Sequence, residues 1–149
     1  MWFLPSCHLW RRRGAADYAR RMDAAEVKRV CLQFPGTYED FPFGPEASVF
    51  KVQAAGGKAK MFALCWLGSS PLTVSLKCEP ELALQLRAAH SQITGAWHMN
   101  KKHWNSVRLD GGLGADLVHD LVEDSYDLVV ASLPRRDRES LAWKGLAGG

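Results

Sequence analysis

The chain has 149 residues, of which 47% are hydrophobic and 23% are charged, and its formal net charge is +3. These values are typical of one soluble globular domain, and no apolar run approaches the about 20 residues that a membrane span needs. Residues 1–21 hold five arginines and one aspartate, so the remaining 128 residues carry 14 basic and 15 acidic side chains. An anionic partner must therefore be argued from where the charges lie, because the bulk charge of the domain gives no reason for one.

Residues 1–21, MWFLPSCHLWRRRGAADYARR, differ in composition from the rest and form a basic leader. Their apolar run is too short for a secretory signal, and the positive charges follow the run instead of preceding it. Three interpretations stay open: a disordered basic arm, translated sequence upstream of a true start at Met22, or an Arg-rich organellar presequence.

The first half of the domain reads as one helix, a loop and three strands. Asp23 followed by Glu26 is a helix-start signal, and Val27, Val30 and Cys31 give the helix one apolar face. Phe34-Pro35-Gly36 ends it. The acid-, Pro- and Gly-containing segment after it predicts a loop, and Gly-rich turns separate the strand-like runs after that. The predicted elements are a helix over 23–33, a loop over 37–47, and strands near 48–53, 60–66 and 72–78.

The second half reads as two helices around a pair of strands. Pro80 and Glu81 suit the first turn of a helix. A turn through Met99-Asn100 joins the next two strands, and Pro134 ends the last helix. The predicted elements are a helix over 80–90, strands near 94–98 and 103–109, a helix over 115–132, and a basic, then Gly-rich, flexible tail over 134–149.

The resulting order, α-β-β-β-α-β-β-α, predicts an α+β fold for residues 22–133. Hairpin-like connections imply one antiparallel sheet, and helices on one face of it give a two-layer domain. The other sheet face is then expected to be largely open to solvent or to a partner.

Basic side chains follow the strands, and acidic ones do not, apart from Asp110 at a strand end. Strand alternation places Thr73, Ser75 and Lys77 on one face, and Trp104, Ser106 and Arg108 likewise face outward. Lys and Arg neutralise phosphates and Trp stacks on bases, although strand lysines also discourage edge-to-edge aggregation. The candidate DNA contacts are Lys51, Lys60, Lys77, Lys101, Lys102, Trp104 and Arg108.

Histidines offer the clearest alternative to a DNA surface. His98 and His103, with His90 or His119 as a third ligand, match no zinc spacing and have no Cys or carboxylate beside them. The sequence also lacks a GxSxG motif and a P-loop lysine. We therefore expect no catalytic residues, no metal and no cofactor, and a protein that is not an enzyme.

Cysteines and acids read as ordinary structural residues. Cys7, Cys31, Cys65 and Cys78 lack CxxC spacing and indicate reduced core positions of a cytosolic protein. Asp120, Glu123, Asp124 and Asp127 form one acidic helix face, which predicts a solvated surface; frataxin-like iron binding is the alternative.

Five segments in order resemble the MmcQ/YjbR family of small bacterial proteins, over about residues 22–133. They are CLQFPGTYEDFPFG, GGKAKMFAL, VSLKCEPE, HMNKKHW followed by V-x-L-D, and LVEDSYDLVVASL. The resemblance implies a two-layer fold similar to the frataxin homologue CyaY and to secretion chaperones. It also implies DNA binding, since members are commonly described so and the fold resembles a double-wing arrangement.

Together these observations predict a cytoplasmic, non-enzymatic DNA-binding protein with weak sequence preference and strong salt dependence. One alternative is a protein-interaction module that uses the same face as a secretion chaperone would. A second alternative is a small-molecule or metal binder near His98, His103 and Trp104. The sequence does not determine the DNA target, the pathway or the oligomeric state.

Overall fold

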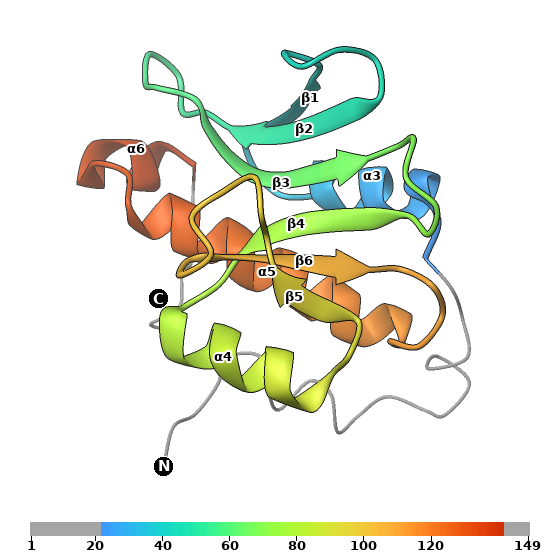
Figure 1. Cartoon of the computed structure of the whole chain (residues 1–149). Helices are drawn as coiled ribbons and strands as arrows, with labels where there is room; N and C mark the ends of the chain where they lie inside the picture. Colours follow the sequence, from blue (N-terminus) through green and yellow to red (C-terminus); the bar gives the residue numbers. More distant parts are fainter. Residues whose placement is uncertain (1–21, 142–149) are drawn as a thin grey trace.

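The computed structural model describes residues 22–141, and they form one six-stranded antiparallel sheet with helices packed on one face. The strand order is β1-β2-β3-β4-β6-β5. In Figure 1, α3 and α5 lie behind the sheet and α4 lies along its β5 edge. The predicted α+β class, the single antiparallel sheet and its helical layer are thus confirmed. The predicted leader over 1–21 and the end of the tail lie outside the described residues.

The first helix begins where the sequence predicts. In α3 (Ala24–Leu32) Asp23 is the N-cap, and its carboxylate accepts a hydrogen bond from the Glu26 backbone N–H at 2.8 Å. After it, β1 (Thr37–Asp40) pairs with β2 (Ala47–Val52). The expectation that 37–47 is all loop is therefore wrong for its first four residues. β1 is a short, polar edge strand whose pairing with β2 holds it extended.

The middle of the chain follows the predicted order closely. Helix α4 (Pro80–Ala89) has Pro80 at its first helical position. The following strand, β5, is shorter than predicted, and an eight-residue loop replaces the predicted turn before β6. The bounds are β3 (Lys60–Trp66), β4 (Thr73–Lys77), β5 (Ile93–Gly95) and β6 (Trp104–Arg108).

The last predicted helix is α5 (Ala115–Ala131), and a further short helix, α6 (Arg135–Ser140), follows Pro134. The prediction of a flexible tail from residue 134 is therefore wrong for α6, which is a regular helix. Its Asp137 is buried, which anchors the helix on the domain. No helix among residues 22–141 is long and apolar enough to cross a membrane.

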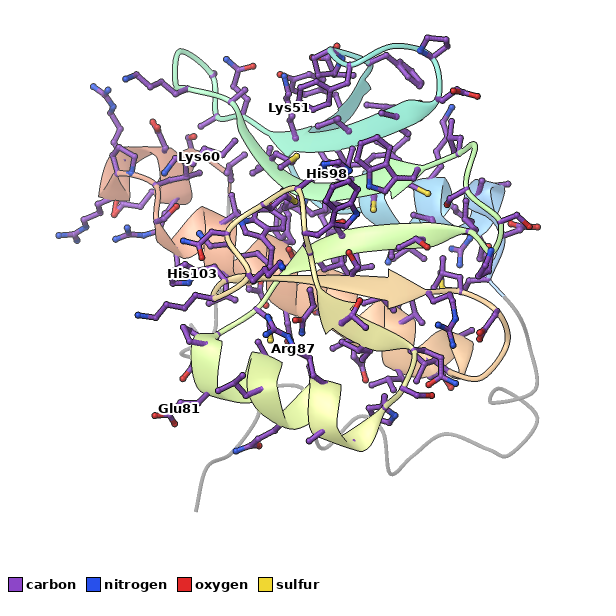
Figure 2. All side chains as sticks on the ribbon, viewed as in Figure 1. Lys51, Lys60, Glu81, Arg87, His98 and His103 are labelled. Atoms are coloured by element: carbon purple, nitrogen blue, oxygen red, sulfur yellow. The ribbon has the colours of Figure 1, made fainter. Side chains whose placement is uncertain are left out.

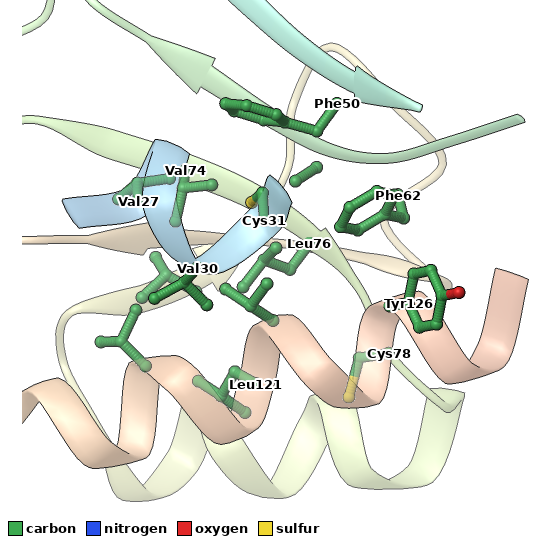
Figure 3. Packing of buried hydrophobic residues seen from close by; sticks show 14 of the residues in the cluster. Val27, Val30, Cys31, Phe50, Phe62, Val74, Leu76, Cys78, Leu121 and Tyr126 are labelled. Carbon is green, nitrogen blue, oxygen red and sulfur yellow. The ribbon is translucent and has the colours of Figure 1, made fainter. Parts of the chain in front are cut away.

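The main core fills the space between the sheet and the helices (Figure 3). Phe62 of β3 packs edge-on against Tyr126 of α5, with ring centroids 5.4 Å apart, and Phe34 stacks on Tyr126 at 4.8 Å. The Tyr126 hydroxyl donates to the Pro35 carbonyl at 2.6 Å, so the end of α3 is tied to α5. These contacts hold the helical layer in one position on the sheet.

The sheet face away from the helices, the outer face, is not open as predicted. A second apolar cluster of Ala47, Val49 and Leu64 is buried there, and Met99 from the β5–β6 loop packs against it. Figure 1 shows this loop crossing in front of β4 toward β3. The prediction was wrong because the loop, which the sequence suggests to be a simple hairpin turn, is long enough to fold back over the strands.

Candidate nucleic-acid interface

Three of the predicted contacts share the outer face, as strand alternation predicts. In the register of β4 with β6, Lys77 lies opposite Trp104 and Thr73 lies opposite Arg108. All three predicted residues, Lys77, Trp104 and Arg108, are partly exposed. Yet Trp104 and Arg108 stand at opposite ends of β6, about 13 Å apart at the usual rise of a strand. The face therefore does not form one continuous basic surface.

Most of the predicted cations gather at one end of the sheet, where β3 begins, β4 ends and β6 begins. Figure 2 shows Lys60 and His103 on this side of the molecule. The loop that carries Lys101 and Lys102 leads directly into β6 there, and both side chains are exposed. We call this surface the basic end; its residues are Lys58, Lys60, Lys77, Lys101, Lys102, Trp104, Arg135 and Arg136.

Helix α6 adds arginines that the sequence analysis did not include. Lys60 Nζ donates to Ser132 Oγ at 3.0 Å, which places the start of β3 beside the residues that lead into α6. The β2–β3 turn at Gly57 lies against the Asp137 carboxylate. The side chains of Arg135 and Arg136 are 84% and 91% exposed, although Arg135 pairs with Glu139 at 3.0 Å and Arg136 lies 4.0 Å from Asp137. The run RRDR is the sequence signal for this basic surface, although the sequence analysis predicts a flexible tail there.

Two predicted contacts, Lys51 and Arg108, carry charges that are already paired. Lys51 Nζ lies 2.8 Å from Asp40 Oδ2, and Arg108 Nε lies 2.6 Å from Asp110 Oδ2. The hydrogen bond from Lys51 lowers the pKa of Asp40, and that from Arg108 lowers the pKa of Asp110. The side chains of Lys51 and Arg108 are only 25% and 41% exposed, against 84% and 91% for Arg135 and Arg136, so their paired charges are less accessible to phosphate. We leave both out of the basic end.

The loop over residues 96–103 owes its shape to Asn100. The Asn100 carbonyl accepts hydrogen bonds from the backbone N–H groups of His103 and Trp104, at 3.0 and 2.9 Å. Its side-chain oxygen accepts from the Lys102 N–H at 3.0 Å, an arrangement typical of Asn in turns. The two lysines therefore sit on a defined turn, while Met99 on the other side is anchored in the outer-face cluster.

Arg87 of α4 holds the 96–103 loop in place, a role that the sequence analysis did not predict. Its guanidinium donates to Asn105 Oδ1 at 2.7 Å and also to the Lys101 carbonyl. A guanidinium presents several donors in one plane, which suits it to bind two or more oxygens at once. In Figure 2 Arg87 lies between α4 and the strands. Arg87 is thus a positioning residue, and its charge is directed toward the protein.

Acidic residues limit the basic end on one side. Glu79 and Glu81 lie at the start of α4, and Figure 2 shows Glu81 at the margin of the same end of the molecule. Both are exposed. An approaching polyanion is therefore favoured from the side of the 96–103 loop and α6, and is disfavoured from the side of α4.

The alternative of one metal or small-molecule site formed by both His98 and His103 is not supported by where these two side chains lie. His98 and His103 occupy separate places, with His98 over the sheet and His103 at the basic end (Figure 2). The His98 ring lies against Trp97 and Trp66, with centroid separations of 3.5 and 5.4 Å. Within residues 22–141, the group of ligand atoms close enough to hold a metal is His119, Asp120 and Glu123, within 4.8 Å of one another.

The acidic face of α5 is not the solvated surface that was predicted. Asp120 is fully buried and Asp124 is 8% exposed, whereas Glu123 is partly exposed. The helical period alone placed these residues opposite the apolar stripe, but α5 is covered on more than one side. The predicted core positions of Cys31, Cys65 and Cys78 are confirmed, since all three are free thiols and buried. Cys7 lies outside the described residues.

Comparison with known proteins places this chain among small relatives of similar length. A sequence model of the YjbR family matches residues 32–128. The uncharacterised protein YjbR of Escherichia coli K12 is 34% identical over 120 residues, which cover 80% of this chain and 98% of that protein. The uncharacterised protein YbdF of Escherichia coli O157:H7 is 38% identical over 113 residues, covering 76% of this chain and 88% of YbdF.

Solved structures agree with the fold. The crystal structure of a Deinococcus radiodurans protein with the domain DUF419 is similar at a TM-score of 0.77 and 38% identity, covering 82% of this chain and 89% of that one. A crystal structure of a Pseudomonas syringae protein is similar at a TM-score of 0.60 and 31% identity, covering 72% and 98%.

Proposed function

The chain belongs to the YjbR family, and we propose that it is a non-enzymatic DNA-binding protein that contacts phosphates through the basic end. The observation that carries the proposal is the position of Lys101 and Lys102. Both are exposed on a turn held by Asn100, and no carboxylate among residues 22–141 lies within ion-pair distance of either. DNA binding also agrees with what the family resemblance implies.

Electrostatic contacts to phosphate dominate this proposed interface. Lysine ammonium groups act as point charges on phosphate, and each neutralised phosphate releases counterions. Four such contacts, by Lys60, Lys77, Lys101 and Lys102, give a slope of log K against log salt of about −3.6. Base edges are read best by bidentate side chains, and the unpaired cations of the basic end are mainly lysines, so sequence preference is weak.

The test replaces two lysines without reversing their charge. In the full chain, Lys101→Gln/Lys102→Gln removes two phosphate contacts, and the slope for a short DNA duplex becomes shallower by about 1.8. The matched control is Lys28→Gln/Arg29→Gln on α3, where both cations already pair with Glu39 and Glu26. The control removes the same net charge at a distance from the basic end, and its slope stays near that of the parent.

Two results contradict the proposal. If the full chain does not shift duplex DNA at low salt, it has no DNA-binding activity of this kind. If both variants weaken binding equally, DNA responds to net charge or to the arginines of residues 1–21, and the basic end is not the interface.

A protein-interaction module is the alternative that one further observation favours. Phe41 and Phe43 in the β1–β2 loop are 45% and 68% exposed, and Leu67 beside this loop is 39% exposed. Exposed aromatic groups of this kind mark protein contact sites. Under this alternative, Phe41→Ser/Phe43→Ser abolishes association with a partner protein and leaves DNA binding unchanged.

A further inference from the structure

A pocket of about 210 Å³ lies between the outer face of the sheet and the 96–103 loop. Strands β3, β4 and β6 form its floor through Leu64, Ser75 and Ser106, and the first half of the loop forms its wall. Figure 2 shows His98 of this loop over the sheet. The lining residues are Leu64, Trp66, Ser69, Thr73, Ser75, Ala96, Trp97, His98, Met99 and Ser106.

Two serine hydroxyls on the floor of this pocket are not used by the fold. Ser75 and Ser106 lie opposite each other in the β4–β6 register, and Ser75 is only 2% exposed. No residue of the described chain forms a hydrogen bond with either hydroxyl. The other two hydroxyls differ, since Thr73 donates to the Pro71 carbonyl and Ser69 to the Trp66 carbonyl. Ser75 and Ser106 both line the pocket, so their hydroxyls are available to donate to and accept from a ligand there.

Three aromatic rings stand in series along the pocket. Trp97 is 73% exposed although it is a large apolar side chain, and its ring lies 3.5 Å from that of His98. The His98 ring in turn lies 5.4 Å from that of Trp66. An exposed tryptophan beside a pocket offers a free π-face on which a flat ring can stack.

The chemistry of the lining restricts the ligand. None of the lining residues is Asp, Glu, Lys or Arg, so the inserted group carries no full charge. Pockets for drug-sized ligands measure about 300–1,000 Å³, and this one is smaller, which limits the inserted group to about one ring system. A serine hydroxyl both donates and accepts, which suits a ring edge with donors and acceptors side by side.

From these observations we propose that the pocket binds a single nucleobase, stacked along Trp97 and hydrogen-bonded through its edge to Ser75 and Ser106. Bases taken out of a helix are recognised in this manner, by stacking between aromatic side chains and by hydrogen bonds to the base edge. The base belongs either to a free nucleoside or to an unpaired stretch of a nucleic acid strand.

The pocket and the basic end are connected. Ser75 lies two residues before Lys77 on β4, and Ser106 lies two residues after Trp104 on β6, each a step of about 7 Å along the same face. The 96–103 loop carries pocket residues in its first half and Lys101 and Lys102 in its second. A strand whose base enters the pocket therefore places its phosphates beside these lysines. This second source of the base rests on the proposed function, whereas the free nucleoside does not.

The test compares nucleosides with single strands, using the full chain. Adenosine and thymidine are titrated by saturation-transfer NMR. An oligothymidylate of about ten nucleotides, and the same oligonucleotide with abasic sites, are titrated by fluorescence anisotropy. Trp97→Ala weakens binding of the intact ligand by about tenfold or more, Trp97→Phe restores most of it, and Ser75→Ala/Ser106→Ala also weakens it. Leu84→Ala, at a 64% exposed position on α4, is the control and changes nothing.

The outcomes separate this inference from the proposed function. Trp97-dependent binding of nucleosides supports the pocket even if neither oligonucleotide binds, and the separate titration with duplex DNA then decides the proposed function. Trp97-dependent binding of the intact oligonucleotide alone, with loss on abasic substitution, supports the pocket with a strand as its source. The pocket does not take a base if no nucleoside binds and, in addition, the intact oligonucleotide binds no better than the abasic one or binds Trp97→Ala as well as the parent protein. DNA binding through the basic end still stands in that case.

Discussion

The junction of α5 with the sheet depends on one side-chain group, the hydroxyl of Ser125. The pairing of β3 with β4 ends at Ala63 opposite Leu76, so Phe62 and Lys77 would be the next backbone partners. Instead the buried Ser125 hydroxyl stands between them. It accepts a hydrogen bond from the Lys77 N–H at 2.8 Å and donates to the Phe62 carbonyl at 2.6 Å.

Ser125→Ala leaves both backbone groups without this partner. A buried donor or acceptor that loses its hydrogen bond costs about 1–3 kcal/mol. Alanine is the better helix former and returns up to about 0.5 kcal/mol. With two such groups and this return, the free energy of unfolding is expected to fall by about 1.5–5.5 kcal/mol. Ser91→Ala is the control, since Ser91 is exposed and its loss costs about 0.5 kcal/mol or less.

The assay is equilibrium unfolding in urea, followed by circular dichroism, with the midpoint and slope fitted for each variant. A loss for Ser125→Ala below about 0.5 kcal/mol would refute the reasoning. It would mean that β3 and β4 close together in the variant, so that Lys77 donates directly to Phe62 and the hydroxyl is dispensable.

Two further predictions concern the backbone and the thiols. Gly36 has a φ of 75°, and a Cβ there would collide with Leu141 Cδ2, whereas a Cβ at Gly44, with a φ of 106°, would meet no atom within 4 Å. Gly36→Ala should therefore lower the urea midpoint clearly more than Gly44→Ala. Equal losses in the two variants would contradict the packing at Gly36. Burial raises the pKa of Cys65 to about 11 and that of Cys78 to about 12, while unfolded thiols ionise near about 8.5. Because the pKa values of these thiols are higher in the folded than in the unfolded protein, their contribution to stability is complete below about pH 8.5 and falls as the pH rises toward 11. An unchanged urea midpoint between about pH 8 and 10 would count against buried thiols.

Local sequence signals predicted much of the fold. The Asp23 cap and the placement of Pro80 depend only on neighbouring residues, so they are readable without tertiary structure. Strand alternation placed Lys77, Trp104 and Arg108 on one face for the same reason, since the period of a strand is fixed by its backbone.

Contacts distant in sequence explain the predictions that were wrong. β1 is extended because β2 pairs with it, and its four polar residues show no apolar period of their own. The charge of Lys51 appears free in the sequence, but the pairing of β1 with β2 brings Asp40 to it. Arg108 is different, because Asp110 lies only two residues away and this local pair could be read from the sequence. The burial of Asp120 and Asp124 likewise comes from elements packed around α5.

The candidate site divides along the same line. The sequence by itself determined the chemistry of the HMNKKHW segment: paired lysines, an asparagine suited to a turn, and aromatic rings. Tertiary structure alone decided that Met99 packs on the outer face, that Arg87 holds the loop, and that α6 adds arginines beside Lys60. The physical reason is that backbone periods and turn preferences act within a few residues, whereas ion pairing, burial and pockets depend on which distant side chains the sheet brings together.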